Sequence, residues 1–131
     1  MAWIYFNLNP LEKRTGDCVV RALSYAFNQT WDDTYWELAQ TGYERAEMPS
    51  WNSAWWDLLK KKGFRRHVIP DTCPDCYTVE DFCRDHPKGK YVLFIPHSNE
   101  GSGHVVAVEH GNVYDVWDST HEIPLVYWRK E

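Results

Sequence analysis

The chain lacks any apolar run that approaches the ~20 residues needed to cross a membrane. Its first segment, residues 1–6, has neither the basic start nor the long apolar core of a secretion signal. The sequence therefore predicts a cytoplasmic protein without membrane contact. In a reducing cytosol we expect its four cysteines to be thiols or metal ligands rather than disulfides.

An excess of basic residues is also missing. The 131 residues include 14 Lys and Arg against 19 Asp and Glu, a formal net charge of −5 at pH 7. Proteins that bind the phosphates of nucleic acids usually present a basic patch. The one dense basic run, at residues 60–66, follows a predicted helix end, where the helix dipole favours cations. We therefore expect no nucleic-acid partner.

Internal repeats, low-complexity tracts and linker-like segments are absent from the sequence as well. The chain is long enough to bury a real core, and 44 % of it is hydrophobic and 16 % aromatic. This composition predicts one folded domain over residues 1–131. Eight Trp and eight Tyr exceed what packing usually requires, so some are candidates to line a cleft or a partner surface.

Hydrophobic periodicity places most helices before most strands. We expect helices at residues 17–28, 31–41, 51–62 and 79–86, and strands at residues 2–6, 64–69, 91–95, 104–109, 113–118 and 125–128. A polar loop, residues 98–103, is a candidate rim for a site. This order is typical of an α+β domain, with N-terminal helices packed on a small antiparallel sheet.

The first predicted helix begins with a cysteine, Cys18, just after Gly16 and Asp17. Thiolate is the reactive form, and a helix N-terminus or a neighbouring imidazolium lowers the thiol pKa from about 8.5. Gly16 would let a substrate come close to the sulfur. The alternative is a buried cysteine that packs as a small hydrophobe.

A histidine and two acids lie in a predicted hairpin further along the chain. His104 opens the first strand, and Asp115 and Asp118 lie in the second. With a three-residue loop at 110–112, His104 would lie opposite Asp118. With a two-residue loop at 110–111, His104 would lie on the same face of the sheet as Asp115. The two differ because a shift of one residue in the strand pairing moves every side chain to the other face. The three-residue loop gives the more uniformly apolar face, and its Asn tolerates a left-handed conformation. We therefore predict Asp118 as the partner of His104.

Three stretches together resemble a known family: Thr15–Leu23, Gly103–Val108 and Val113–Ser119. They resemble the papain-like cysteine peptidases and their smaller relatives, the leader peptidases of bacteriocin transporters. They also look like small uncharacterised phage-borne proteins, which would act in the host cytoplasm. In the family the nucleophile begins the central helix, the histidine opens a strand, and an Asn or Asp ends the following strand. The resemblance implies a minimal papain-like fold.

The same resemblance implies acyl transfer by a catalytic triad of Cys18, His104 and Asp118. Cys18 would attack a carbonyl, His104 would take and return the proton, and Asp118 would orient the imidazole. The substrate would be a peptide or another amide. The acyl acceptor would be water in a peptidase or amidase, or an amine in an acyltransferase.

At one position the sequence departs from the family pattern. Glu12 stands where the family has a glutamine that donates a hydrogen bond to the oxyanion, and an ionised carboxylate cannot donate one. Asn7 or Asn9 could supply the amide if their loop folds back, together with the backbone N–H of Cys18.

Four further residues have the types and spacing of a Cys3His zinc site: Cys73, Cys76, Cys83 and His86. Zinc there would be structural, because four protein ligands leave no open position. The alternative is that Cys83 belongs to the core and that the first two cysteines only tighten a loop. We expect no other cofactor.

The sequence is also compatible with a function of another class than hydrolysis. It is a non-catalytic binding module on the same fold, with or without a structural zinc ion, that holds a host protein with its aromatic surface. The Trp content and the missing glutamine favour this module. The order and context of the thiol, imidazole and acid favour the enzyme.

Overall fold

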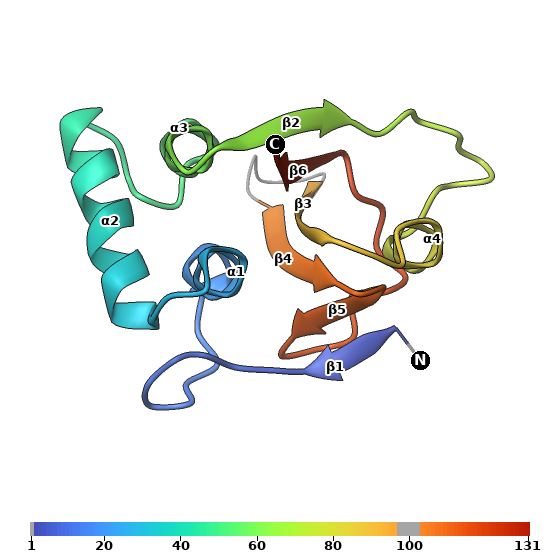
Figure 1. Ribbon diagram of the computed structural model, residues 1–131, viewed down its shortest axis with the longest axis horizontal. Coiled ribbons are helices and arrows are strands. Elements are labelled where there is room, and N and C mark those ends of the chain that lie inside the picture. Colours follow the sequence, from blue (N-terminus) through green and yellow to red (C-terminus); the bar gives the residue numbers. More distant parts are fainter. Residues whose placement is uncertain (1, 97–102) are drawn as a thin grey trace.

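In the computed structural model, which describes residues 2–96 and 103–131, helices and strands follow the predicted order (Figure 1). The helices are α1 (Cys18–Phe27), α2 (Trp31–Glu44), α3 (Asn52–Lys61) and α4 (Val79–Asp85). The strands are β1 (Trp3–Tyr5), β2 (Phe64–Val68), β3 (Lys90–Pro96), β4 (Gly103–Glu109), β5 (Asn112–Asp115) and β6 (Val126–Lys130). The predicted α+β class is confirmed. The predicted loop at 98–103 lies, apart from Gly103, outside the described residues.

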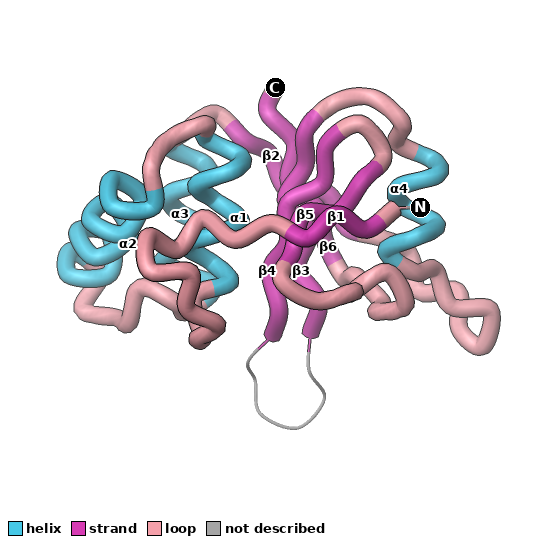
Figure 2. The backbone as a smooth tube through the Cα atoms, turned by 90° about the horizontal axis from the view of Figure 1, so that it is seen from below, coloured by secondary structure: helices cyan, strands magenta, loops and turns pink. Residues whose placement is uncertain are grey.

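The sheet forms the middle of three layers, which Figure 2 shows nearly edge-on. Its six strands have the order β1-β5-β4-β3-β6-β2. Helices α1, α2 and α3 lie on one side of the sheet, and α4 lies with long loops on the other side. Both faces are therefore covered, which explains why the inner strands β3 and β4 are buried along almost their whole length.

One pair of strands differs from the predicted antiparallel sheet. β1 pairs with β5 in parallel, with Trp3 opposite Val113, whereas the other described pairs are antiparallel. The sheet is therefore mixed, and the antiparallel prediction is wrong for this pair. A parallel pair needs a long connection rather than a tight turn. Here that connection includes all the helices, so no local pattern in the sequence reveals the pairing.

The helices begin where the sequence offers caps. The Thr30 side chain accepts a hydrogen bond from the Asp33 N–H at the start of α2, and Thr78 forms a capping box with Asp81 at the start of α4. Asp17 occupies the N-cap position of α1, as predicted, but its carboxylate makes no capping bond. Side chains from outside the first turn of the helix engage it instead.

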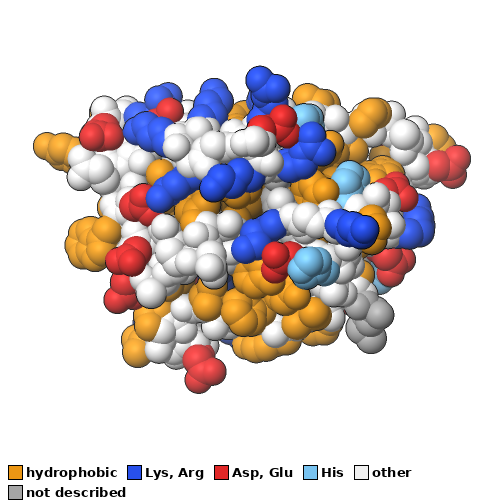
Figure 3. Space-filling view, in the orientation of Figure 1, with side chains coloured by type: hydrophobic (Ala, Val, Ile, Leu, Met, Phe, Trp, Pro, Cys, Tyr) orange, Lys and Arg blue, Asp and Glu red, His pale blue; other side chains and the backbone are white. Residues whose placement is uncertain are grey.

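Basic side chains gather along the outer strand β2 and the end of α3 (Figure 3). Lys60 and Lys61 lie in the last turn of α3, which confirms the predicted placing at a helix end. Lys61 is 3.3 Å from Asp57, and Lys62 is 2.7 Å from Glu37. Charged side chains on an outer strand oppose pairing with the edge of another sheet.

Two apolar clusters fill the spaces between the layers. The cluster beneath α1 and α3 includes the fully buried Trp55 and Trp128. The cluster beneath α4 includes Phe82, Leu93 and Val108. Each large apolar side chain buried in this way stabilises the fold by roughly 1.5–3 kcal/mol. Among the helices of residues 2–96 and 103–131, none has the length and apolar character that a bilayer crossing demands.

Leu23 of α1 has no exposed surface and should contribute strongly to stability. Leu23→Ala is expected to lower the free energy of unfolding by about 2–5 kcal/mol, because apolar burial is lost and a cavity remains. Leu11→Ala is the matched control: Leu11 is 74 % exposed, and its loss should cost less than ~0.5 kcal/mol. Urea denaturation of both variants measures the difference, and equal losses would contradict this assignment of the core.

Candidate active site

Cys18 is the first residue of α1, the helix that packs on β4. Its half-buried side chain borders a pocket of about 290 Å³. Apolar side chains form much of the wall, among them Trp55, Phe94 and Val105. Gly16 also borders the pocket, and a Cβ at this position would meet no atom within 4 Å. The pocket is therefore open beside Gly16, so that a ligand can approach the sulfur.

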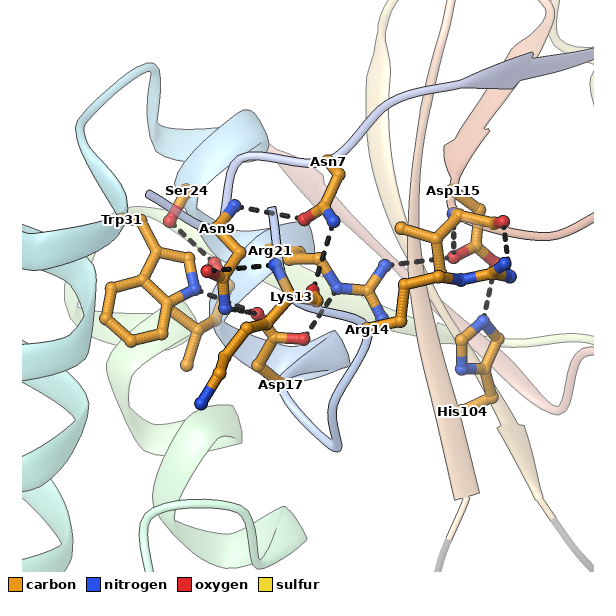
Figure 4. Close-up of polar contacts among 12 residues, drawn as sticks. Asn7, Asn9, Lys13, Arg14, Asp17, Arg21, Ser24, Trp31, His104 and Asp115 are labelled. Atoms are coloured by element: carbon orange, nitrogen blue, oxygen red, sulfur yellow. Dashed lines mark hydrogen bonds and ion pairs between the residues drawn. The ribbon is translucent and has the colours of Figure 1, made fainter. Parts of the chain in front are cut away.

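The imidazole of His104 lies between the thiol of Cys18 and the carboxylate of Asp115. Its Nε2 is 2.6 Å from Oδ2 of Asp115, and both of these side chains are buried (Figure 4). Because Nε2 is engaged by the acid, Nδ1 is the ring nitrogen left to face the thiol. The structure thus brings together a thiol from α1, an imidazole from β4 and a carboxylate from β5.

The acid in this group is Asp115 and not the predicted Asp118. Asp118 is exposed, and its Oδ1 accepts hydrogen bonds from the N–H and the hydroxyl of Thr120, at 3.0 and 2.6 Å. It stabilises a turn after β5 and has no contact with His104. The prediction of Asp118 as the partner of the imidazole is therefore wrong.

The turn between β4 and β5 explains this correction. Its loop has two residues, His110 and Gly111, rather than the predicted three. Both have a positive φ, 53° and 75°, as the central residues of a tight hairpin turn require. Glycine adopts this conformation freely, and histidine is enriched in it among the other residues. In this register Asp115 lies on the same face as His104, and a one-residue slip would present Asp118 instead.

The electrostatics of the site favour a thiolate–imidazolium pair. Burial alone would raise the pKa of the Cys18 thiol, but a hydrogen bond and positive charge from His104, the Val105 N–H and the charge of Arg21 hold that pKa below its usual value. Burial alone would lower the pKa of His104, yet its hydrogen bonds to Asp115 and Cys18 raise it to about 9. The His104 imidazole is therefore protonated at neutral pH, and the pKa of Cys18 is shifted in favour of the thiolate.

The Asp115 carboxylate stays ionised in spite of its burial. Burial raises its pKa, but the hydrogen bond and charge of His104, the Val116 N–H and the Arg21 guanidinium together lower it below the usual value. The Ser119 hydroxyl also donates to its Oδ2 at 3.1 Å. The ring of Trp117 packs on the imidazole, with ring centroids 4.7 Å apart, and shields the ion pair from water.

Arg21 and Asp17 belong to the same buried network, although the sequence did not assign them to the site. Arg21 Nη1 is 3.1 Å from Asp115 Oδ1, and its Nε is 2.9 Å from Asp17 Oδ1. Oδ2 of Asp17 accepts hydrogen bonds from Asn9 Nδ2 and Trp31 Nε1 (Figure 4). A signal was present in the sequence: Arg21 is the one charged residue of α1 and lies one helical turn after Asp17.

The two amides predicted as oxyanion donors have other partners. Asn7 Nδ2 donates to a backbone carbonyl at 3.1 Å, and Asn9 Nδ2 donates to Asp17 at 3.1 Å. Neither residue borders the pocket at Cys18. Donors at this pocket include the N–H groups at the start of α1, which have no partner inside the helix, and the amide of Asn52, a pocket-lining residue that the sequence did not single out.

The four predicted zinc ligands do not meet at one point. Cys73 and Cys76 form a disulfide, which contradicts the expectation that every cysteine is a thiol or a metal ligand. Two cysteines so close on a loop can reach each other as readily as a metal. Burial raises the pKa of the Cys83 thiol to about 11, and the ring of His86 stacks on Phe82 with centroids 3.8 Å apart. In the parts of the chain that the structure describes, no group of His, Cys, Asp and Glu has an arrangement that could hold a metal ion.

These contacts equip the site for nucleophilic chemistry. A thiolate at a helix N-terminus can attack, an imidazolium beside it can donate a proton, and a carboxylate orients the imidazolium. Comparisons of the chain with family models, curated proteins and solved structures found no match. The chemistry must therefore be inferred from the site itself.

Cys18 is expected to react with iodoacetamide at a lower pH than an ordinary thiol, because His104 keeps it ionised. His104→Ala should slow this reaction at neutral pH by about tenfold or more, since one pKa unit changes the thiolate fraction tenfold. Peptide mass spectrometry over a pH series measures the rate at each cysteine.

The buried thiol of Cys83, whose pKa is raised to about 11, is an internal control and should stay unlabelled in the folded protein. If Cys18 were labelled with the pH profile of a free thiol, the ion pair would be disproved.

Proposed function

We propose that the protein is a thiol-dependent hydrolase, a cysteine peptidase or amidase, with Cys18, His104 and Asp115 as its catalytic residues. The observation that supports this most strongly is the position of the imidazole, which is 2.6 Å from Asp115 Oδ2 and hydrogen-bonded to the Cys18 thiol. A nucleophile that begins α1 and a histidine near the start of β4 support a minimal papain-like fold.

In the proposed reaction the Cys18 thiolate attacks the carbonyl carbon of an amide bound in the pocket. The His104 imidazolium gives its proton to the leaving amine as the carbon–nitrogen bond breaks, and an acyl-thioester remains on the sulfur. Neutral His104 then takes a proton from water, which attacks the thioester and restores the thiolate. Asp115 accepts the Nε2 hydrogen bond throughout and stabilises the imidazolium.

Negative charge on the substrate oxygen needs hydrogen-bond donors in the pocket. The N–H groups at the start of α1 have no partners in the helix, and the helix dipole favours an anion there. We propose that they form the oxyanion site with the Asn52 amide, in place of the predicted Asn7 and Asn9. The aromatic pocket wall would hold an apolar part of the acyl group.

A protein-binding module is the second candidate, supported by a different observation. Three aromatic side chains on α2 and before α3 are exposed: Trp36 by 70 %, Tyr43 by 84 % and Trp51 by 55 %. Large exposed aromatic residues are enriched at protein interfaces. A module of this kind would bind its partner whether or not the Cys18 thiol is intact.

Acylation by p-nitrophenyl acetate tests the enzyme. The wild-type protein should release a burst of nitrophenolate and gain one acetyl group at Cys18, whereas Cys18→Ser should show no burst. Slow release of the acetyl group to water identifies a hydrolase, and faster release with an added amine identifies an acyltransferase. A wild-type protein that is never acylated would leave only the binding module.

The two aspartates provide a matched pair for the same assay. Asp115→Asn should lower the acylation rate at neutral pH by about tenfold or more, because His104 loses the carboxylate that raises its pKa and the thiolate loses its imidazolium. Asp118→Asn should change the rate little, since within residues 2–96 and 103–131 its carboxylate bonds only to Thr120. The reverse order of effects would restore the acid predicted from the sequence.

A further inference from the structure

We propose that Arg21 is a positioning residue of this site: its guanidinium, anchored by Asp17, fixes the Asp115 carboxylate in the place where it holds His104. The inference rests on the proposed function, because Arg21 binds Asp115, the acid of the proposed triad; its positive charge also lowers the pKa of the Cys18 thiol directly. The set of residues that the reaction depends on would then include Arg21 as well as Cys18, His104 and Asp115.

The contacts of Asp115 leave its carboxylate no freedom to turn. Oδ1 accepts from Arg21 Nη1 at 3.1 Å and from the Val116 N–H at 2.7 Å. Oδ2 accepts from His104 Nε2 at 2.6 Å and from Ser119 Oγ at 3.1 Å. In the described part of the chain each oxygen therefore has two donors, and without the Arg21 bond Oδ1 would keep only the bond from the Val116 N–H.

Asp17 in turn prevents Arg21 from moving away. Its Oδ1 is 2.9 Å from Arg21 Nε, and its Oδ2 accepts from Asn9 at 3.1 Å and from Trp31 at 3.0 Å. The guanidinium thus spans two carboxylates with two different nitrogens, as a planar fork can and a lysine ammonium cannot. Figure 4 shows this row of side chains running from Trp31 to His104.

Charges alternate along the row. Asp17 is followed by Arg21, Asp115, His104 and the Cys18 thiolate, so each charge lies beside one of opposite sign. Buried charges need such partners because they have lost their hydration. Without the guanidinium, His104 would be the one charged partner of the buried Asp115 carboxylate among the described residues. The Asp115 carboxyl would then take up a proton at a higher pH and release its hold on His104.

No other charged side chain has a recorded bond to Asp115 among the described residues. His104 approaches it from β4 and Arg21 from α1, with Cys18 beyond the imidazole and Asp17 beyond the guanidinium. The contacts from β1, from the residue after it and from the segment after β5 are uncharged. Trp3 Nε1 and the Phe6 N–H donate to the Asp115 carbonyl. The Ser119 hydroxyl and the Val116 N–H donate to the carboxylate. Replacement of Arg21 therefore removes the one charged partner of the Asp115 carboxylate other than His104 in this part of the chain.

The test is the pH profile of Cys18 alkylation by iodoacetamide in Arg21→Gln. Glutamine keeps a hydrogen-bond donor but removes the charge, so the rise of the alkylation rate with pH should move to higher pH. On the acidic side of the profile the rate should fall by about tenfold, the effect of a shift of one pKa unit. If the Arg21 contacts only stabilise the fold, their loss would lower the melting temperature and leave the pH profile of alkylation unchanged.

Arg14→Gln is the matched control. Arg14 Nη2 donates to the Val116 carbonyl at 2.9 Å, so it binds the segment next to Asp115 without touching a carboxylate. Its replacement should leave the profile unchanged. Arg21→Lys should preserve part of the effect of the charge but lose one of the two carboxylate contacts, and its profile should lie between those of wild type and Arg21→Gln.

If Arg21→Gln fails to fold, the double variant Asp17→Asn/Arg21→Gln removes the carboxylate that the arginine neutralises and should restore the fold while it keeps the shifted profile. A wild-type profile in the folded Arg21→Gln or double variant overturns the positioning role but leaves the hydrolase intact. A wild-type Cys18 that reacts like a free thiol overturns both proposals, because no ion pair then exists to be positioned.

Discussion

The two-residue turn at His110 and Gly111 is the constraint on which the site depends. Both residues adopt a left-handed backbone, and this sets the register of β5 against β4. The register in turn decides that Asp115 faces His104, because side chains alternate between the faces of a sheet. A turn exposed at the far end of the hairpin thereby selects the acid of the site, several residues away from it.

The second constraint is the cost of burying charge. His104, Asp115 and Asp17 are all less than a tenth exposed, and each would be strongly destabilised there alone. They are offset by one another, by Arg21 and by neutral donors such as Trp31. The partners of this buried network therefore come from the segment before α1, from α1 and α2, and from the β4–β5 hairpin. The pairing of opposite charges that offsets the cost of burial also favours the reactive thiolate form of Cys18.

Helix α1 contributes both to the apolar core and to the candidate active site. Its apolar side chains, Leu23 among them, fill the core against the sheet, while its first turns present Cys18 and Arg21 to the site. An amphipathic pattern with one cationic exception is therefore the expected sequence of a helix that serves both the core and the site. Stability of the core and geometry of the site cannot vary independently along this helix.

Local patterns in the sequence determined the types and order of the elements, the caps of α2 and α4, and the placing of Cys18 at a helix start and His104 in a strand. Each of these depends on residues within a few positions of one another. Only the tertiary structure decided the parallel pairing of β1 with β5, the choice of Asp115 over Asp118, and the bond between Arg21 and an acid 94 residues away. The reason is physical: these contacts join distant segments, and packing and burial of charge select them where local preferences leave several alternatives of similar energy.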